Sequence, residues 1–511
     1  MRTKYSFYNL LINLFASVLI PVLGFIKVRL FIDLYGSSLN GMQLTLMQFI
    51  TYLNIFEIAY SLAFRQLLYQ PLADGDQNKI KEIYYGAKKI FRFTGMVLLL
   101  VGVVFSFVAP GLANSTISNS EVTLSFLVLF VPYALSYFLM GPNFVIIADQ
   151  QEYKISIWIQ SISIFKMLLM VIVILLKLPY LLVFTIEGAQ ILIANSLARF
   201  IALKNYPWLN DDCENHSNKQ FLHNIYYTLA HRFADIANSN TDNIIISAFY
   251  GYGLVSIYGA YSYFIDALNK IISAIINSPI NSFGNLFSEN KQRAYKVFLE
   301  LYSFSSYMGT IIAACIFIFM NQLVYFWIGD ESYVLSLMTS FFFAINIYYM
   351  TQRSPLIICR DTNGLYKEAV LNSYIMAFVK IVFSIILIKN YKITGILIAT
   401  SLSYWLIDFL YTPKLVYRKA FSLPASKYYK IILKRLLIAA LLTVVGYVIW
   451  LNVYDANLLS LSNFVISVLL VGMTIFIMTT IIYVVFFQEF RLLIKRFYLL
   501  IKNRGDKNEK A

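Results

Sequence analysis

The chain has 511 residues, of which 59% are hydrophobic, 17% aromatic and only 13% charged, and its mean hydropathy is +0.68. A water-soluble protein of this length cannot hide so much apolar surface, whereas a protein with many membrane spans exposes it to lipid. The net charge of +15 would suit a nucleic-acid-binding protein, but no basic domain stands apart from the apolar segments, so nucleic-acid binding is excluded.

Apolar stretches of roughly 20 residues, long enough to cross a bilayer as a helix, recur along the whole chain. They predict an all-α polytopic membrane protein with about 14 transmembrane helices. These helices are expected near residues 5–34, 40–64, 88–109, 121–147, 154–177, 179–202, 221–250, 254–287, 295–321, 333–356, 366–389, 391–415, 431–452 and 460–487. The first apolar run is too long for a cleavable signal peptide, so it is expected to remain as a transmembrane helix.

Lysine and arginine are unevenly distributed between the predicted loops. Residues 111–120, 321–332 and 452–459 contain none of the 41, whereas the alternate loops and the C-terminal tail are rich in them. Cytoplasmic loops of membrane proteins carry an excess of these cations. Both termini are therefore predicted to be cytoplasmic.

The sequence contains two related halves. Tyr35-Gly36 recurs as Tyr250-Gly251, and the segment from Pro142 to Lys154 recurs as Pro355 to Lys367, at almost the same interval along the chain. Six helices per copy make both copies enter the membrane in the same direction. This predicts parallel repeats with a binding site between them.

The domain organisation follows from the repeat. It comprises an N-terminal six-helix lobe (1–203), a cytoplasmic linker (204–220), a C-terminal six-helix lobe (221–418), two further transmembrane helices (431–487) and a basic cytoplasmic tail (488–511).

The first segment of the second lobe, from Phe221 to Gly251, is apolar but carries Arg232, Asp235, Ser239 and Asp242. At 100° per residue these four fall within roughly an 80° arc of one helix face. Ionisable residues are costly in hydrocarbon and normally face a bundle interior or a water-filled cavity. We interpret this face as one wall of a transport cavity, although Arg232 and Asp235 are also close enough in sequence to neutralise each other.

The ionisable face continues in the next helix with Asp266 and Lys270, four residues apart. In the first helix, Arg29 precedes Asp33 by four residues, which is a natural ion-pair spacing, while Lys27 lies on a different, polar face. The second helix carries Glu57 far from either end, either in the cavity or as a buried partner of a basic residue.

Lys166 and Lys380 occupy equivalent positions in the middle of a span in each repeat. Cations placed symmetrically at this depth suit an anionic ligand held between the halves. They are equally suited to pairing with Glu187, Asp408 or Glu57.

Several enzyme-like patterns are better explained as loops. Asp74-Gly75-Asp76 has the spacing of a glycosyltransferase motif but lies in a short polar segment that predicts a solvated turn. The polar residues of 211–216 lack metal-ligand spacing, and the scattered Cys213, Cys315 and Cys359 form neither a metal site nor a disulfide framework. No metal, cofactor or ATP-binding loop is expected, so energy must come from an ion gradient, the membrane potential or the substrate gradient.

Four sequence segments together resemble a known family. They are VRLFIDLYGSSLNG between the first two helices, FEIAYSLAFRQLLYQPLADGD after them, NTDNIIISAFYG with VSIYGAY at the start of the second lobe, and NGLYKEAVLN with FSIILIKNYKITGILIATSLS near helices eleven and twelve. The chain resembles the Wzx-type polysaccharide flippases of the multidrug/oligosaccharidyl-lipid/polysaccharide (MOP) exporter superfamily. The resemblance covers nearly the whole chain.

The resemblance implies two six-helix lobes in a V around a central cavity, as in the MATE transporters, with two extra helices. It implies a transporter, not an enzyme, that flips undecaprenyl-diphosphate-linked oligosaccharide for O-antigen, capsule or exopolysaccharide across the bacterial cytoplasmic membrane. Polymerases and glycosyltransferases of the same pathway would be its partners. A diphosphate group suits the cations Lys27, Arg29, Lys166, Arg232, Lys270 and Lys380, and the carboxylates Glu57, Asp235, Asp242 and Asp266 are candidates for binding a coupling ion.

Three alternatives remain open. A drug/cation antiporter of the same superfamily would favour an acidic cavity, and a peptidoglycan-precursor flippase would also handle an anionic lipid. A membrane-bound oligosaccharide polymerase or ligase would need a large external loop, and every predicted external loop is short.

Overall fold

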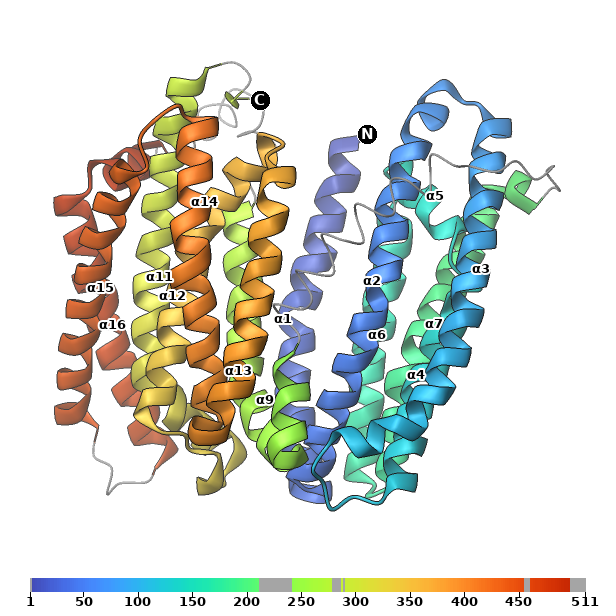
Figure 1. The fold of residues 1–511 in the computed structure, drawn as a ribbon, viewed down its shortest axis with the longest axis horizontal. Coiled ribbons are helices and arrows are strands. Elements are labelled where there is room, and N and C mark those ends of the chain that lie inside the picture. The colour runs from blue at the N-terminus through green and yellow to red at the C-terminus, as the bar shows by residue number, and fades with distance from the viewer. Residues whose placement is uncertain (1, 211–240, 278–285, 288–289, 455–459, 497–511) are drawn as a thin grey trace, which may run out of the picture. The chain divides into compact units, whose positions relative to one another are not determined.

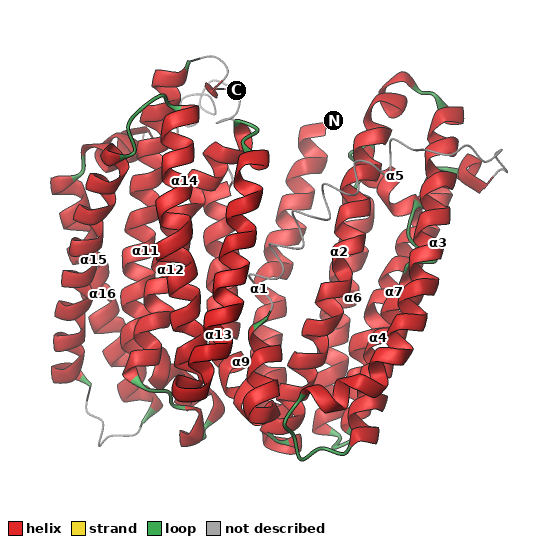
Figure 2. Cartoon of the chain, in the orientation of Figure 1, coloured by secondary structure: helices red, strands yellow, loops and turns green. Residues whose placement is uncertain are grey.

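The computed structural model describes residues 2–210, 241–277, 286–287, 290–454 and 460–496. Within these residues the chain is helical and contains no strand (Figures 1 and 2). It divides into two compact units, Met1–Gly259 and Ala260–Ala511. The predicted linker at 204–220 lies largely outside the described residues.

Unit 1 begins with the N-terminal helices and ends within α9. Its elements are α1 (Arg2–Tyr35), α2 (Ser37–Asp74), α3 (Gln77–Val108), η1 (Ala109–Leu112), α4 (Asn119–Ser136), α5 (Pro142–Ala148), α6 (Tyr153–Leu175), α7 (Tyr180–Asn205), η2 (Pro207–Asn210) and the first part of α9 (Asp242–Asn277). Stacked aromatic rings contribute to its core, including Phe126 on Phe130 and Phe91 on Phe144.

Unit 2 contains the rest of α9 and the helices that follow it. They are α11 (Lys291–Ile328), η3 (Glu331–Tyr333), α12 (Leu337–Thr362), α13 (Tyr366–Leu402), the π-helical turn η4 (Ser403–Asp408), α14 (Phe409–Leu415), the π-helical turn η5 (Val416–Ala420), α15 (Ser426–Val453) and α16 (Leu461–Phe486). The last two helices pack against α11, where Ile318, Trp450 and Val471 share one core.

Ten helical segments among the described residues are long and apolar enough to cross a membrane. Two of the long helices are interrupted by a single non-helical residue, Gly251 in α9 and Lys392 in α13, at which the chain kinks between two helical segments. The long helices α2 and α12 are more polar and are not among the ten. The prediction of an all-helical polytopic membrane protein is confirmed, and the described helices are compatible with fourteen spans.

The repeat landmarks have matching backbone geometry in the two halves of the chain. Gly36 (φ 89°) joins α1 to α2, and Gly251 (φ 76°) divides α9. Lys177 (φ 54°) joins α6 to α7, and Lys392 (φ 48°) divides α13, at the same interval along the chain as the two glycines. The lysine pair is a further correspondence between the halves.

The predicted turn at Asp74-Gly75-Asp76 is confirmed. Gly75 adopts the left-handed conformation that ends α2, and the exposed Asp76 side chain accepts a hydrogen bond from the backbone N–H of Lys79 at the start of α3. This aspartate is a helix cap.

Gly41 allows α2 and the first part of α9 to approach closely within unit 1. A Cβ atom at this position would lie 1.7 Å from the carbonyl oxygen of Tyr252. Nearby, the Asn40 side-chain amide donates to Ser256 Oγ at 2.8 Å, so the approach is also held by a buried hydrogen bond. Small residues serve the same purpose at many helix contacts in membranes.

We expect Gly41→Ala to lower the free energy of unfolding by about 1–3 kcal/mol, because the added methyl group forces the two helices apart. Gly86→Ala is the matched control, since a Cβ on Gly86 of α3 meets nothing within 4 Å. The control should raise stability by about 0.5–1 kcal/mol. Thermal unfolding of the purified variants measures both effects, and equal effects would contradict the close approach.

Candidate functional site: a buried lysine cluster in unit 1

Three charged side chains from α1, α6 and α7 share a buried site in unit 1. Lys166 Nζ lies 2.8 Å from Glu187 Oε1, and these side chains are only 11% and 16% exposed. Lys27 lies within electrostatic range of both Lys166 and Glu187. We call Lys27, Lys166 and Glu187 the lysine cluster; its two lysines and one carboxylate leave one net positive charge.

Lys27 is held by a second helix and by an aromatic ring. Its Nζ donates to Gln43 Oε1 of α2 at 2.7 Å and lies 4.8 Å from the centre of the Phe31 ring. The residue is 7% exposed. An amide and a ring face stabilise a buried ammonium less than a directly hydrogen-bonded carboxylate does.

Polar contacts between α6 and α7 position Lys166 and Glu187. Gln190 Nε2 donates to Ser163 Oγ at 3.2 Å, next to the Lys166–Glu187 pair. Ser163 and Lys166 on α6 are three residues apart and so lie on one face of that helix, as do Glu187 and Gln190 on α7. The two faces contact each other, and the two hydrogen bonds between them fix the direction of the Lys166 side chain.

Arg29 is not part of the lysine cluster. Its Nε lies 2.7 Å from Asp33 Oδ2, and the two side chains are 35% and 49% exposed. The ion pair expected from their spacing in the sequence is confirmed. Arg29 is therefore a weaker candidate for substrate binding than Lys27.

Two of the predicted carboxylates belong to unit 1. Asp242 is buried and accepts a hydrogen bond from Tyr258 Oη at 2.7 Å. Glu57 is half-buried and lies within electrostatic range of Tyr133 and Tyr137, whose hydroxyl groups are 3.1 Å apart. Phenol groups near a carboxylate are partners that accommodate either its ionised or its protonated form.

The remaining predicted residues lie either in unit 2 or outside the described residues. Asp266 and Lys270 are exposed on α9, and Lys380 is buried on α13; all three belong to unit 2. Arg232 and Asp235 lie outside the described residues.

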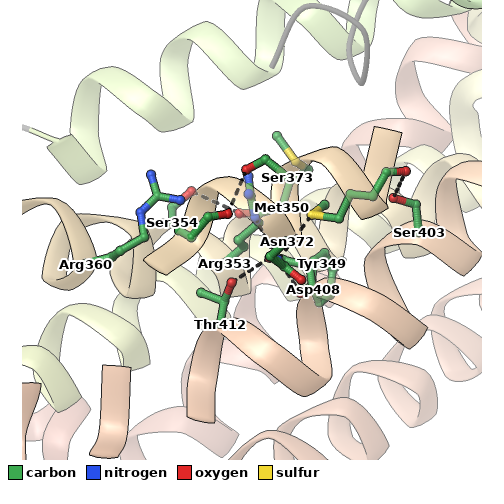
Figure 3. Close-up of polar contacts among 12 residues, drawn as sticks. Tyr349, Met350, Arg353, Ser354, Arg360, Asn372, Ser373, Ser403, Asp408 and Thr412 are labelled. Carbon is green, nitrogen blue, oxygen red and sulfur yellow. Dashed lines mark hydrogen bonds and ion pairs between the residues drawn. The ribbon is translucent and has the colours of Figure 1, made fainter. Parts of the chain in front are cut away.

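Asp408, a candidate partner of the mid-span lysines, is instead the centre of a hydrogen-bonded cluster in unit 2 (Figure 3). Arg353 Nε lies 2.6 Å from its Oδ2 atom, to which Tyr349 Oη also donates at 2.9 Å. Asn372 Nδ2 and Thr412 Oγ1 donate to Oδ1 at 3.0 and 2.6 Å. The carboxylate, fully buried at the end of the η4 turn, thus joins α12, α13 and α14.

Sequence reasoning missed the role of Arg353 in this cluster. The signal is present, because Arg353 and Asp408 are ionisable residues inside two predicted spans. Their wide separation along the chain gives no indication that they pair.

The described residues contain no group of three or more His, Cys, Asp or Glu side chains arranged to hold a metal ion. The polar segment 211–216 lies outside them. Unit 1 also has a cavity of about 350 Å³ with apolar walls, lined in part by Phe49, Tyr52, Phe105 and Phe126.

No protein-family model and no curated protein matches the sequence. Solved structures do match the fold. The structure of lipid II flippase MurJ in an inward closed conformation is similar with a TM-score of 0.67 and 15% identity, covering 93% of this chain and 98% of that one. The chain therefore shares the fold of that structure.

Two multidrug transporters support the same conclusion about the fold. An inward-facing MATE family transporter of the MOP superfamily has a TM-score of 0.55 and 13% identity, covering 80% of this chain and 99% of that one. The MATE multidrug transporter DinF-BH has a TM-score of 0.53 and 14% identity, covering 83% and 96%. The MOP-type fold predicted from the sequence is confirmed, and the chain is a multi-pass membrane protein.

Proposed function

We propose that this protein flips an oligosaccharide linked to undecaprenyl diphosphate from the inner to the outer leaflet of the bacterial cytoplasmic membrane by alternating access. The observation that carries the proposal is the buried lysine cluster of unit 1 within a MOP-type fold. A buried net positive charge at membrane depth is costly and is typical of a site that receives an anion. In this proposal both termini are cytoplasmic.

The chemistry of the lysine cluster suits a diphosphate. Lysine binds phosphate oxygens as a compact charge with three rotatable donors. Lys27 can exchange the neutral amide of Gln43 for a phosphate oxygen without leaving a buried carboxylate unpaired. Lys166 has fewer N–H groups to donate to the ligand, because Glu187 accepts one of its hydrogen bonds.

Energy coupling is the role we propose for Glu57 and Asp242, together with Asp235 and Asp266. A carboxylate that alternately faces water and a buried environment can take up and release a proton or another cation as access changes. Transport that keeps its full ion dependence in Glu57→Gln and Asp242→Asn variants would contradict this role.

Two other transport functions each have a supporting observation. The greater similarity to the MurJ structure than to the MATE structures favours a peptidoglycan-precursor flippase, which would also use the lysine cluster. The apolar cavity of unit 1 would suit an aromatic drug and favours a multidrug exporter.

The deciding experiment is to delete the gene and analyse lipid-linked intermediates by mass spectrometry, with drug susceptibility measured in parallel. We expect undecaprenyl-diphosphate-linked oligosaccharide to accumulate on the cytoplasmic side and the wild-type gene to clear it. Accumulation of peptidoglycan precursor would instead establish a peptidoglycan-precursor flippase. Increased drug sensitivity without any lipid intermediate, in a strain without a redundant flippase, would establish a multidrug exporter.

A further inference from the structure

A buried arginine in unit 2 has no anionic partner among the described residues. Arg435, on α15, is 1% exposed. Its Nε and Nη1 atoms are buried and make no hydrogen bond within the described part of the chain. A guanidinium group stays charged in proteins, so its charge cannot be removed by deprotonation.

Aromatic rings from two neighbouring segments form the walls around this guanidinium. Its Cζ atom lies 4.8 Å from the centre of the Tyr302 ring on α11 and 4.9 Å from that of Phe487, directly after α16. Ring faces stabilise a cation but accept no strong hydrogen bond from its N–H groups. The hydroxyl groups of Tyr302 and Tyr348 are also buried, near Tyr428 and Ser306 respectively, and make no hydrogen bond of good geometry among the described residues.

A second cation lies close to the same aromatic ring. Lys434 Nζ lies 5.2 Å from the same Phe487 ring, so two cations flank one aromatic side chain. The buried carboxylate of Glu300, also on α11, is paired through Oε1 with Arg496 at 3.0 Å. Water could satisfy the N–H groups but would leave the buried charge uncompensated.

We infer that Arg435 on α15, with the hydroxyl groups of Tyr302 on α11 and Tyr348 on α12, forms a binding site for a monovalent anion. A single buried guanidinium balances one negative charge, and its enclosure favours a small ion such as a halide. The phosphodiester of a lipid headgroup also carries one negative charge and is the second candidate for the bound anion. This inference does not depend on the proposed transport function.

The test uses purified, delipidated full-length protein in sodium gluconate. Adding sodium chloride or bromide at constant ionic strength should raise the Tm of wild type by roughly 2–4 °C at saturation. Arg435→Gln should lose this shift, whereas Lys434→Gln, which changes the neighbouring exposed cation, should keep it. If phosphatidylglycerol vesicles raise the Tm in gluconate and halides do not, the anion is the headgroup phosphodiester.

Crystals of wild type grown in bromide provide a readout that does not depend on folding of the variant. We expect an anomalous peak within hydrogen-bond distance of an Arg435 nitrogen, or headgroup density there if lipid is the source. The inference is overturned if neither halide nor phosphatidylglycerol raises the Tm of wild type more than that of Arg435→Gln and no anion density adjoins Arg435.

Discussion

Replacing both lysines of the lysine cluster, as Lys27→Met with Lys166→Met, is expected to reduce flipping at least 100-fold. The two changes remove the buried positive charge and leave Glu187 as the only charged member of the cluster. An interaction between a buried charge and a hydrogen-bonded partner is worth about 2–5 kcal/mol, and each 1.4 kcal/mol is a factor of ten. Clearance of the lipid-linked intermediate in the deletion strain, normalised to protein in the membrane, measures the effect.

The matched control is Arg29→Gln, on the same helix as Lys27. Arg29 is partly exposed and paired with Asp33, and such pairs contribute only about 0.2–1 kcal/mol. This variant should clear the intermediate at close to the wild-type rate. Near-normal transport by the double lysine variant would show that the lysine cluster is structural.

A variant in which Lys166 and Glu187 are exchanged tests whether the position of the Lys166 cation matters in addition to the net charge of the lysine cluster. Lys166→Glu combined with Glu187→Lys keeps the ion pair and the net charge but moves the cation from α6 to α7. If Lys166 only holds the two helices together, this protein should fold and transport normally. If Lys166 also contacts the diphosphate, it should fold normally and transport poorly.

Asp408→Asn is expected to lower the free energy of unfolding by about 3–5 kcal/mol, because it leaves the Arg353 guanidinium without its buried counter-charge. The new amide also directs a donor at side chains that themselves donate to this position, such as Tyr349. Thermal unfolding of the purified variant and its yield in the membrane are the measurements.

Two further variants show whether the Arg353–Asp408 pair itself is responsible. Adding Arg353→Met to Asp408→Asn removes the uncompensated cation and should recover part of the lost stability. Glu368→Gln breaks an exposed ion pair with Lys419 at 2.8 Å and should have a much smaller effect than Asp408→Asn. Equal effects of Asp408→Asn and Glu368→Gln would contradict the central role of the cluster.

Some of the ion pairs could be predicted from the sequence and others could not. The spacing of Arg29 and Asp33 indicates their ion pair, and Glu187 is among the partners expected for Lys166. No such spacing links Asp408 to Arg353, although both residues lie inside predicted spans.

The burial of Arg435 also could not be predicted from the sequence. In the sequence it is one more basic residue near a predicted cytoplasmic loop, where such residues are common. The structure instead buries it almost completely between aromatic rings. Its burial depends on side chains of other helices, which no local pattern specifies.

The sequence by itself determined that this is a helical protein with many membrane spans, because apolar segments of roughly 20 residues are a local property that depends only on the bilayer thickness. It also placed polar residues on particular helix faces, because the helical period fixes them. Only the tertiary structure decided which charges meet: Lys27, Lys166 and Glu187 in one unit, and Arg353 with Asp408 in the other. A helix face specifies a direction, but the partner in that direction depends on the packing of helices that are distant in the sequence.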